Sequence, residues 1–173
     1  MNRVTRRVAS PLGEVVLVGD GQRLHGLYTT GHRRRPTLDT DGVEDGKGDG
    51  LADAAEQLAE WFDGRRREFD LELELIGTPF QRRVWDALGE IPFGATVTYG
   101  ELAARIGRAG SGRAVGHAVG RNPVSIVVPC HRVVGARGVL TGYAGGLDTK
   151  QWLLAHEAGR PPNPSNWSGS APS

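Results

Sequence analysis

Short runs of alternating apolar residues open the chain and predict a small antiparallel sheet. The runs cover residues 4–8, 14–18 and 24–28, and turn-forming residues separate them. Apolar residues then recur at helical spacing over residues 51–62, which predicts a helix packed on that sheet. Further along, Leu71, Leu73 and Leu75 alternate with glutamates and predict one more strand.

The pattern becomes helical after Gly77. Thr78 is a helix cap with Pro79 at the first helical position, which predicts a helix running to about Leu88. Residues 98–101 have the form of a capping box and open another helix, stopped by Gly107.

A second short helix is predicted from Ser111 through about Gly120. Two short helices joined by a glycine turn form a helix-turn-helix candidate, and an ordinary helical hairpin is the alternative. Its residues are mostly small and apolar, so it lacks the amide and guanidinium side chains of a major-groove reader. The glycines suit close approach to a DNA backbone or close packing against another helix, and the pattern leaves both explanations open.

These elements predict an α/β fold in two parts. We expect an N-terminal domain over residues 1–77, a mostly helical domain over 78–160 with a closing helix at 150–157, and a disordered tail over 161–173. Residues 33–50 are rich in glycine, aspartate and arginine and predict a surface loop. Its Arg33–Arg35 run is expected to be solvated rather than to contact DNA.

Composition adds few constraints. Hydrophobic residues make up 38% and charged residues 24%, as in soluble globular proteins, and no stretch approaches the roughly 18 apolar residues of a membrane span. Residues 1–93 hold 13 Lys+Arg and 17 Asp+Glu, whereas residues 94–160 hold 8 and 3. The second part is therefore positive, as expected of a surface that faces phosphates, although solvated charge alone explains it equally well.

The candidate chemistry centres on Cys130, the only cysteine of the chain. A single thiol excludes an internal disulfide or a thiolate zinc cluster, and it suits a reducing intracellular compartment. An apolar run ends at Pro129, and a thiol and the imidazole of His131 follow directly. A lone cysteine is usually a small buried hydrophobe, but a neighbouring histidine and Arg132 favour the thiolate. On an extended segment, Cys130 and His131 would point in opposite directions, so direct contact needs a turn and indirect contact needs a bridging water.

The segment at residues 129–133, Pro-Cys-His-Arg-Val, resembles the active-site signature of the O6-alkylguanine-DNA alkyltransferases. The resemblance extends from about Thr78 to about Glu157. It includes the blocks at residues 113–116, 122–123, 142–147 and 153–157. It implies a ribonuclease-H-like N-terminal domain and a repair activity in which Cys130 irreversibly accepts an alkyl group from guanine O6, and also from thymine O4.

The resemblance also implies roles for residues around the thiol. Glu157 orients His131, which activates Cys130 through a water, so that the three form a relay like a catalytic triad. Asn122 holds the segment that presents Cys130, and Tyr99 donates a hydrogen bond to the departing guanine. A thioether has no good leaving group, so the protein is expected to act once.

The implied partner is double-stranded DNA, bound in the minor groove by the helix-turn-helix with one nucleotide flipped out. Arg113 would fill the gap in the base stack. The remaining residues at DNA or pocket positions are Thr98, Ala114, Val119, Val133, Tyr143, Ala144 and Lys150. At Ala144 some family members have serine, so only a backbone contact is expected there. The resemblance implies no metal or cofactor, and we expect a monomer that is cytoplasmic and associated with the nucleoid through DNA.

Two other classes of function fit part of the sequence. A cysteine hydrolase with a Cys–His–Glu triad would turn over many times and would need an oxyanion hole that no motif identifies. A non-catalytic lesion-binding protein would lack the cysteine, which is present here.

Overall fold

The N-terminal part of the chain is a sheet covered on one face by a helix. The structure is a computed structural model, and it describes residues 3–35, 43–44 and 49–160 of the chain. Strands β1 (Val4–Ser10), β2 (Gly13–Gly19) and β3 (Leu24–Tyr28) pair antiparallel, as predicted. The short β4 (Val43–Glu44) pairs parallel to β1 within the predicted surface loop, which the loop prediction missed. Residues 36–42 and 45–48 of that loop and the predicted tail at 161–173 lie outside the described residues.

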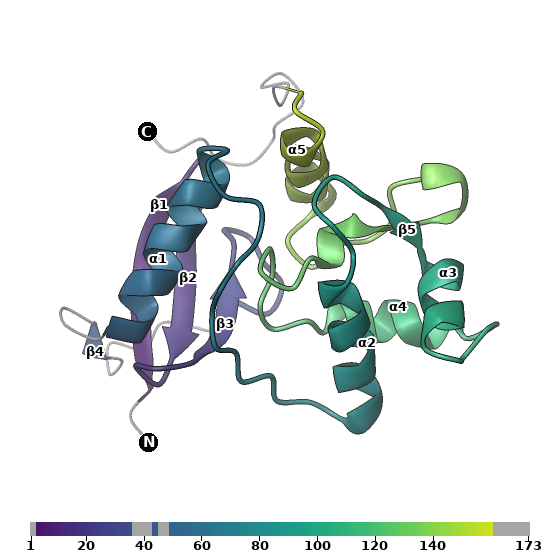
Figure 1. Ribbon diagram of the computed structural model, residues 1–173, viewed down its shortest axis with the longest axis horizontal. Helices are drawn as coiled ribbons and strands as arrows, with labels where there is room; N and C mark the ends of the chain where they lie inside the picture. The colour runs from purple at the N-terminus through teal and green to yellow at the C-terminus, as the bar shows by residue number, and fades with distance from the viewer. Residues whose placement is uncertain (1–2, 36–42, 45–48, 161–173) are drawn as a thin grey trace.

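Helix α1 (Asp49–Phe62) packs against β1 and β2 (Figure 1), which confirms the predicted helix. Leu51, Leu58 and Trp61 of this helix are buried. The apolar positions that set its helical spacing are thus the positions that face the sheet, as the 3.6-residue period requires.

The strand predicted at residues 71–75 is wrong. Only one bridge forms there, between Leu24 and Leu73, through the bonds Leu24 N to Glu72 O (2.9 Å) and Glu74 N to Leu24 O (3.0 Å). The three leucines are half-buried because the segment lies along the edge of β3 as a connection between the two parts. The alternation correctly predicted that the leucine side chains face the protein interior, but it does not require that the segment form a continuous series of hydrogen bonds with a neighbouring strand.

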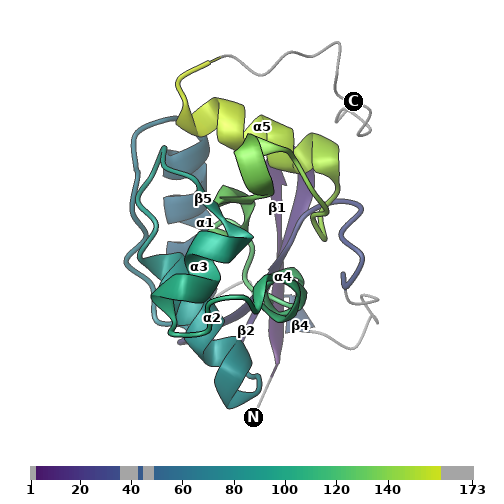
Figure 2. The ribbon, with the colours of Figure 1, turned by 90° about the vertical axis from the view of Figure 1, so that its right-hand side faces the viewer.

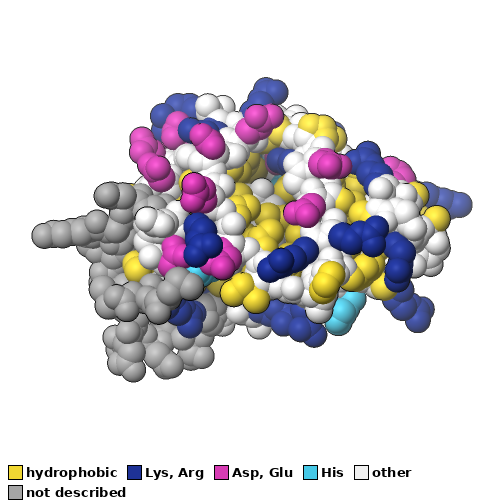
Figure 3. Space-filling model, turned by 60° about the horizontal axis from the view of Figure 1, so that its bottom comes forward, with side chains coloured by type: hydrophobic (Ala, Val, Ile, Leu, Met, Phe, Trp, Pro, Cys, Tyr) yellow, Lys and Arg dark blue, Asp and Glu magenta, His cyan; other side chains and the backbone are white. Residues whose placement is uncertain are grey.

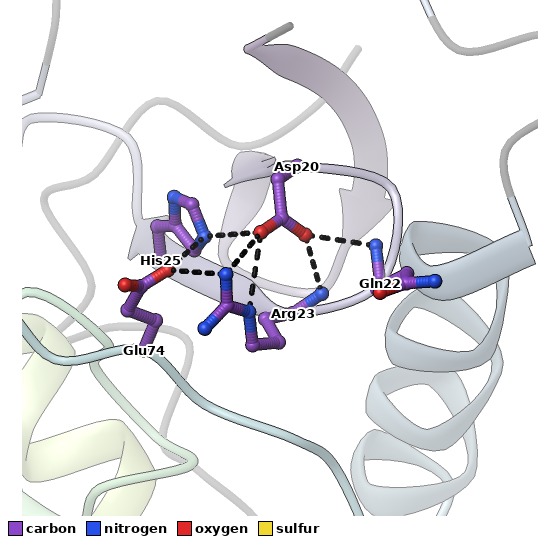
Figure 4. Close-up of polar contacts among 5 residues, drawn as sticks. All are labelled: Asp20, Gln22, Arg23, His25 and Glu74. Carbon is purple, nitrogen blue, oxygen red and sulfur yellow. Dashed lines mark hydrogen bonds and ion pairs between the residues drawn. The ribbon is translucent and has the colours of Figure 1, made fainter. Parts of the chain in front are cut away.

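An ion cluster fixes this connection to the β2–β3 turn (Figure 4). The Arg23 guanidinium lies 3.0 Å from Asp20 Oδ2 and 3.1 Å from Glu74 Oε2, and His25 Nε2 lies 3.2 Å from the same two oxygens. The backbone N–H groups of Gln22 and Arg23 donate to Asp20 Oδ1. These hydrogen bonds, despite the opposing effect of burial, hold the pKa of Asp20 far below its usual range.

The C-terminal part is mostly helical, as predicted. It comprises α2 (Pro79–Gly89), α3 (Tyr99–Arg105), α4 (Gly112–Gly120) and α5 (Leu147–Glu157), with short 3₁₀ turns η1 (Cys130–Arg132) and η2 (Ala136–Gly138). Strands β5 (Val97–Thr98) and β6 (Val133–Val134) form a two-stranded parallel pair. Figure 2 shows α5 across one end of the molecule, away from α4. No helix in the described part of the chain is both long and apolar enough to cross a membrane.

The predicted cap of α2 is confirmed. Thr78 accepts a hydrogen bond from Gln81 N, the Gln81 side chain accepts one from Thr78 N, and Pro79 occupies the first turn. Trp85 on this helix donates from Nε1 to Ala118 O at 2.9 Å, which joins α2 to α4. Gly77 allows this packing, because a Cβ there would lie 2.5 Å from the Trp85 ring.

Helices α3 and α4 follow each other closely. Thr98 caps α3 by accepting from Glu101 N at 3.1 Å, and Gly107 and Gly110 take positive φ angles in the turn between the helices. Ser111 precedes α4 but makes no side-chain cap hydrogen bond. The two helices pack on each other and on α2, so the three helices form one packed unit beside the cavity described below.

Candidate active site

The segment that carries Cys130 is a series of tight turns rather than a strand. Ile126 has a φ of 72°, Val128 N donates to Val124 O at 3.0 Å, and Cys130 N donates to Val128 O at 2.8 Å. Cys130 and His131 then begin the 3₁₀ turn η1. The structure therefore has a turn at the thiol, but the turn does not give direct contact, because neither ring nitrogen of His131 has a hydrogen-bond partner among the described residues.

Asn122 fastens the start of this segment to its end. Its Nδ2 donates to Val128 O at 2.8 Å, and its Oδ1 accepts from Val124 N at 3.0 Å. Asn122, Val124 and Val128 are all buried, so water cannot reach the two backbone groups and the Asn122 side chain supplies their hydrogen-bond partners instead. The side chain of Asn122 thus sets the conformation two residues before Cys130.

The thiol is held in a mostly buried environment, with Cys130 5% exposed. Burial raises the pKa of Cys130, although hydrogen bonding to Asn122, Tyr143 and Ser125 and the charge of Lys150 act in the opposite direction. The expectation that the neighbours in sequence favour the thiolate is therefore wrong in its net direction. A thiol in this setting stays protonated until a base accepts its proton.

His131 and Glu157 lie side by side behind the thiol. His131 Nε2 is 3.1 Å from Glu157 Oε2, although the contact does not have the geometry of a hydrogen bond. Burial lowers the pKa of His131, against the opposing effect of Glu157, so the imidazole is neutral. With a carboxylate facing Nε2, the proton belongs on Nε2 and Nδ1 is left as the acceptor. His131 Nδ1 is buried and has no hydrogen-bond partner among the described residues.

Arg132 is a site residue that the sequence did not assign. Its Nε donates to Glu157 Oε1 at 2.9 Å, a terminal nitrogen donates to Oε2 at 2.5 Å, and the other donates to Ile91 O at 2.5 Å. Burial alone would raise the pKa of Glu157, but the hydrogen bonds and charges of His131 and Arg132 lower it to about 2. The only signal in the sequence was a charged residue inside an apolar run, which when buried requires a partner.

A cavity of about 270 Å³ opens over the thiol. Of the residues singled out from the sequence, it is lined by Cys130, Asn122, Tyr99, Val119, Tyr143 and Ala144. His32 and Arg33 of the N-terminal part also line it, and no pattern in the sequence indicated this.

Two predicted pocket residues lie behind this lining. Val133 is fully buried and pairs with Val97 in the β5–β6 pair. Lys150 donates from Nζ to Thr141 O at 3.2 Å, and its ammonium lies 5.9 Å from the centroid of the Tyr99 ring. Thr141 in turn donates to the Tyr99 hydroxyl at 3.4 Å, so Lys150 supports two residues of the cavity wall.

The residues expected at a DNA surface lie around α4. Arg113 and Ala114 are exposed in its first turn, Thr98 is half-buried at the cap of α3, and Val119 is buried toward the cavity. Lys and Arg side chains gather on the side of the molecule that the helical part forms (Figure 3).

Helix α4 also borders a second hollow of about 520 Å³. It is lined by Arg33, Arg34, Gly116, His117, Gly120 and Arg121. A Cβ on Gly116 would lie 3.4 Å from the Tyr99 ring, an ordinary van der Waals distance, and one on Gly120 would have nothing within 4 Å. Close packing therefore requires neither glycine, and both line the two hollows.

One group of side chains in the described part of the chain has ligand atoms spaced for a metal ion. These are Asp20, His25 and Glu74, within 4.8 Å of one another. The Arg23 guanidinium already lies between the two carboxylates and supplies the positive charge there (Figure 4), so the cluster is satisfied as an ion-pair network.

Known proteins resemble this chain over most of its length. The family model of the 6-O-methylguanine DNA methyltransferase DNA binding domain matches residues 79–159. A methylated-DNA–protein-cysteine methyltransferase of Mycolicibacterium paratuberculosis is 51% identical over 152 residues, covering 88% of this chain and 90% of the relative. One from Methanosarcina barkeri is 45% identical over 150 residues, covering 87% and 94%.

A solved structure resembles the whole chain. The crystal structure of Mycobacterium tuberculosis OGT in complex with DNA has a TM-score of 0.82 at 44% identity and covers 94% of this chain and 97% of that chain. The fold and the relatives together define the class as that of the DNA-repair methyltransferases. Within that class, the chain belongs to the 6-O-methylguanine DNA methyltransferase family.

Proposed function

We propose that the protein repairs alkylated DNA directly, by moving an alkyl group from O6 of guanine to Cys130. The observation that carries this proposal is the single thiol at a cavity of about 270 Å³, lined by an aromatic ring and polar groups. The names of relatives that cover about nine-tenths of the chain support the same activity.

The transfer is a displacement at carbon. Cys130 Sγ forms a bond to the alkyl carbon as the bond from that carbon to guanine O6 breaks. The thiol proton passes to His131 Nδ1 through a bridging water, a role supported by the buried and unpartnered state of that nitrogen. The departing guanine takes a proton, and Tyr99 in the cavity lining is the donor we propose.

Glu157 supports the proton acceptor in this scheme. Its carboxylate stays ionised, since its pKa is lowered to about 2, and it lies at the Nε2 side of His131. A negative charge there stabilises the imidazolium that forms when Nδ1 accepts the thiol proton. Because no step cleaves the resulting thioether, each molecule acts once.

The finer proposals concern DNA. We propose that α3 and α4 act as a helix-turn-helix in the minor groove, and that the damaged nucleotide is flipped into the cavity. The exposed Arg113 and Ala114 in the first turn of α4, and small residues along that helix, support this. Arg113 would occupy the gap in the base stack.

For the whole chain we propose a ribonuclease-H-like N-terminal domain over residues 1–77, a working domain over 78–160, and a monomer as the active form. The hydrolase alternative is not favoured, because the relatives carry the methyltransferase name over most of their length. The non-catalytic alternative is not favoured either, because Cys130 is present at the cavity.

The test is intact mass after incubation with duplex DNA containing O6-methylguanine. We expect one addition of about 14 Da per molecule, located on the peptide that carries Cys130, as for a methyl-acceptor thiolate. The Cys130→Ser variant and an undamaged duplex serve as controls and should show no addition. Multiple turnovers, or an unmodified Cys130, would contradict the proposal.

A further inference from the structure

His32 brings the N-terminal part of the chain into the cavity. It lies in the turn after β3, where His32 N donates to Thr29 O at 3.1 Å and Arg35 N donates to His32 O at 3.0 Å. The residue is 5% exposed, and the Tyr28 ring meets the imidazole edge-on with centroids 5.3 Å apart. The residue lines the same cavity as Cys130.

The turn that carries His32 is attached to the opposite part of the cavity wall. Arg33 N donates to Ala144 O at 2.9 Å. A Cβ on Gly145 would lie 2.8 Å from Thr29 Oγ1, so the two segments are in close contact with no space for a side chain between them. The position of His32 relative to Ala144 and Gly145 is therefore fixed by a backbone hydrogen bond after it and by the close contact of Thr29 before it.

The imidazole is held in one state and one orientation. Its Nδ1 accepts a hydrogen bond from Arg34 N at 3.0 Å, so the proton of the neutral ring is on Nε2. Burial first, and then the charges of Arg33 and Arg34, lower the pKa of His32 to about 4. Nε2 is buried and has no hydrogen-bond partner among the described residues. A buried group of this kind in a native fold calls for an explanation, and a position at a ligand cavity provides one.

We propose that His32 is a specificity-determining residue: it lies in the wall that the N-terminal part contributes to the cavity, beside Arg33, and its bulk limits the size of the alkyl group that Cys130 can accept. The proposal rests on the proposed alkyl transfer and goes beyond it by naming a residue outside the matched DNA-binding region, residues 79–159, that selects among lesions.

The alternative is that His32 only shapes its turn. An imidazole Nδ1 that accepts from the N–H group two residues later imitates the turn made by an asparagine side chain. His32→Asn therefore keeps an acceptor for Arg34 N while removing the outer half of the ring. His32→Phe does the reverse, because it keeps the bulk and loses the acceptor. His32→Ala removes both.

The experiment measures single-turnover rate constants of the full-length chain with two free bases, O6-benzylguanine and O6-methylguanine. The quantity compared among variants is the ratio of the benzyl-transfer rate constant to the methyl-transfer rate constant. We expect the ratio to rise about tenfold in His32→Ala and His32→Asn, since a few atoms removed from the wall of a pocket change selectivity by about that amount, and to stay at the parent value in His32→Phe. Thermal unfolding of each variant checks that the fold is retained.

Two outcomes would overturn the proposal. One is an unchanged ratio in all three variants. The other is a change in His32→Ala and His32→Phe but not in His32→Asn, which would assign the effect to the turn. Failure of the proposed function is a separate result, because the parent chain would then transfer neither group to Cys130.

Discussion

The Arg132 guanidinium is paired with the carboxylate of Glu157 through two of its nitrogens, at 2.9 Å from Oε1 and 2.5 Å from Oε2. The same carboxylate lies 3.1 Å from His131 Nε2. Adjacent residues of one turn thus share a single buried carboxylate from α5. Arg132 fixes its position, and His131 experiences its charge.

Replacing Glu157 by glutamine is expected to slow alkyl transfer by about 100-fold at pH 7, because a general base that loses its charged partner accepts a proton less readily. The rate should recover in part at higher pH, where bulk base ionises Cys130 directly. The sign follows because the partner stabilises imidazolium, so its loss makes thiolate formation harder. The measurement is the pH–rate profile of single-turnover transfer.

Arg132→Gln is the matched control for that variant. It also breaks the buried ion pair, which costs about 3–5 kcal/mol in a typical case, but it leaves Glu157 beside His131. If both variants slow equally and neither recovers at high pH, the loss comes from the fold, and the relay through Glu157 is wrong.

The acid stability of the protein should depend on Glu157. Its folded pKa of about 2 lies below the value of about 4.3 in an unfolded chain, so its contribution is complete above about pH 4.3 and is lost as the pH falls toward 2. Urea midpoints measured between pH 7 and pH 2.5 should fall less steeply in Glu157→Gln than in the parent. Identical slopes in the two proteins would mean that the carboxylate is not held ionised.

Arg113→Ala should slow repair of duplex DNA while leaving the reaction with free O6-benzylguanine near the parent rate. Arg113 is exposed in the first turn of α4 and is absent from the cavity lining, so it has no contact with the thiol. Extruding a nucleotide costs a few kcal/mol, and only the duplex requires it. Arg65→Ala, an exposed arginine of the N-terminal part, loses the same charge and should leave both rates unchanged. Equal losses on both substrates in Arg113→Ala would place this residue in the pocket instead.

Asn122→Ala should lower the free energy of unfolding by about 2–3 kcal/mol and slow the transfer, because Val128 O and Val124 N would be left buried without partners. Ser125→Ala is the comparison, since Ser125 is close to the thiol but does not join the two ends of the segment. Urea unfolding and single-turnover rates on both variants check this, and a fully stable and fully active Asn122→Ala would show that the segment holds its shape without it.

Local rules predicted the elements whose signals are contained in a few residues. Thr78 and Pro79 define the start of α2 because capping involves only neighbouring residues. The alternating residues Leu71, Leu73 and Leu75 were misassigned because alternation shows which side is buried and does not show whether a partner strand continues.

The sequence predicted only those residues of the site that carry a local signal near Cys130 or that the family resemblance supplied. The pairing of Arg132 with Glu157 spans 25 residues, and His32 reaches the cavity from the other part of the molecule, so neither contact has a local signature. The direction of the Cys130 pKa was also missed, because neighbouring charges are visible in a sequence and desolvation is not.

Strand β3 has a further consequence for the integrity of the chain. Its outer edge is occupied along its length, by the Leu24 bridge to Leu73 at one end and by the bonds of Leu27 N to Pro123 O (2.9 Å) and Ser125 N to Leu27 O (3.4 Å) at the other. An uncovered strand edge is a template for aggregation. The segment that presents the thiol therefore also protects the sheet, so a fragment ending at residue 77 would expose a pairing edge and should self-associate. The contacts that hold the reactive turn in place therefore also protect the N-terminal half against misassembly.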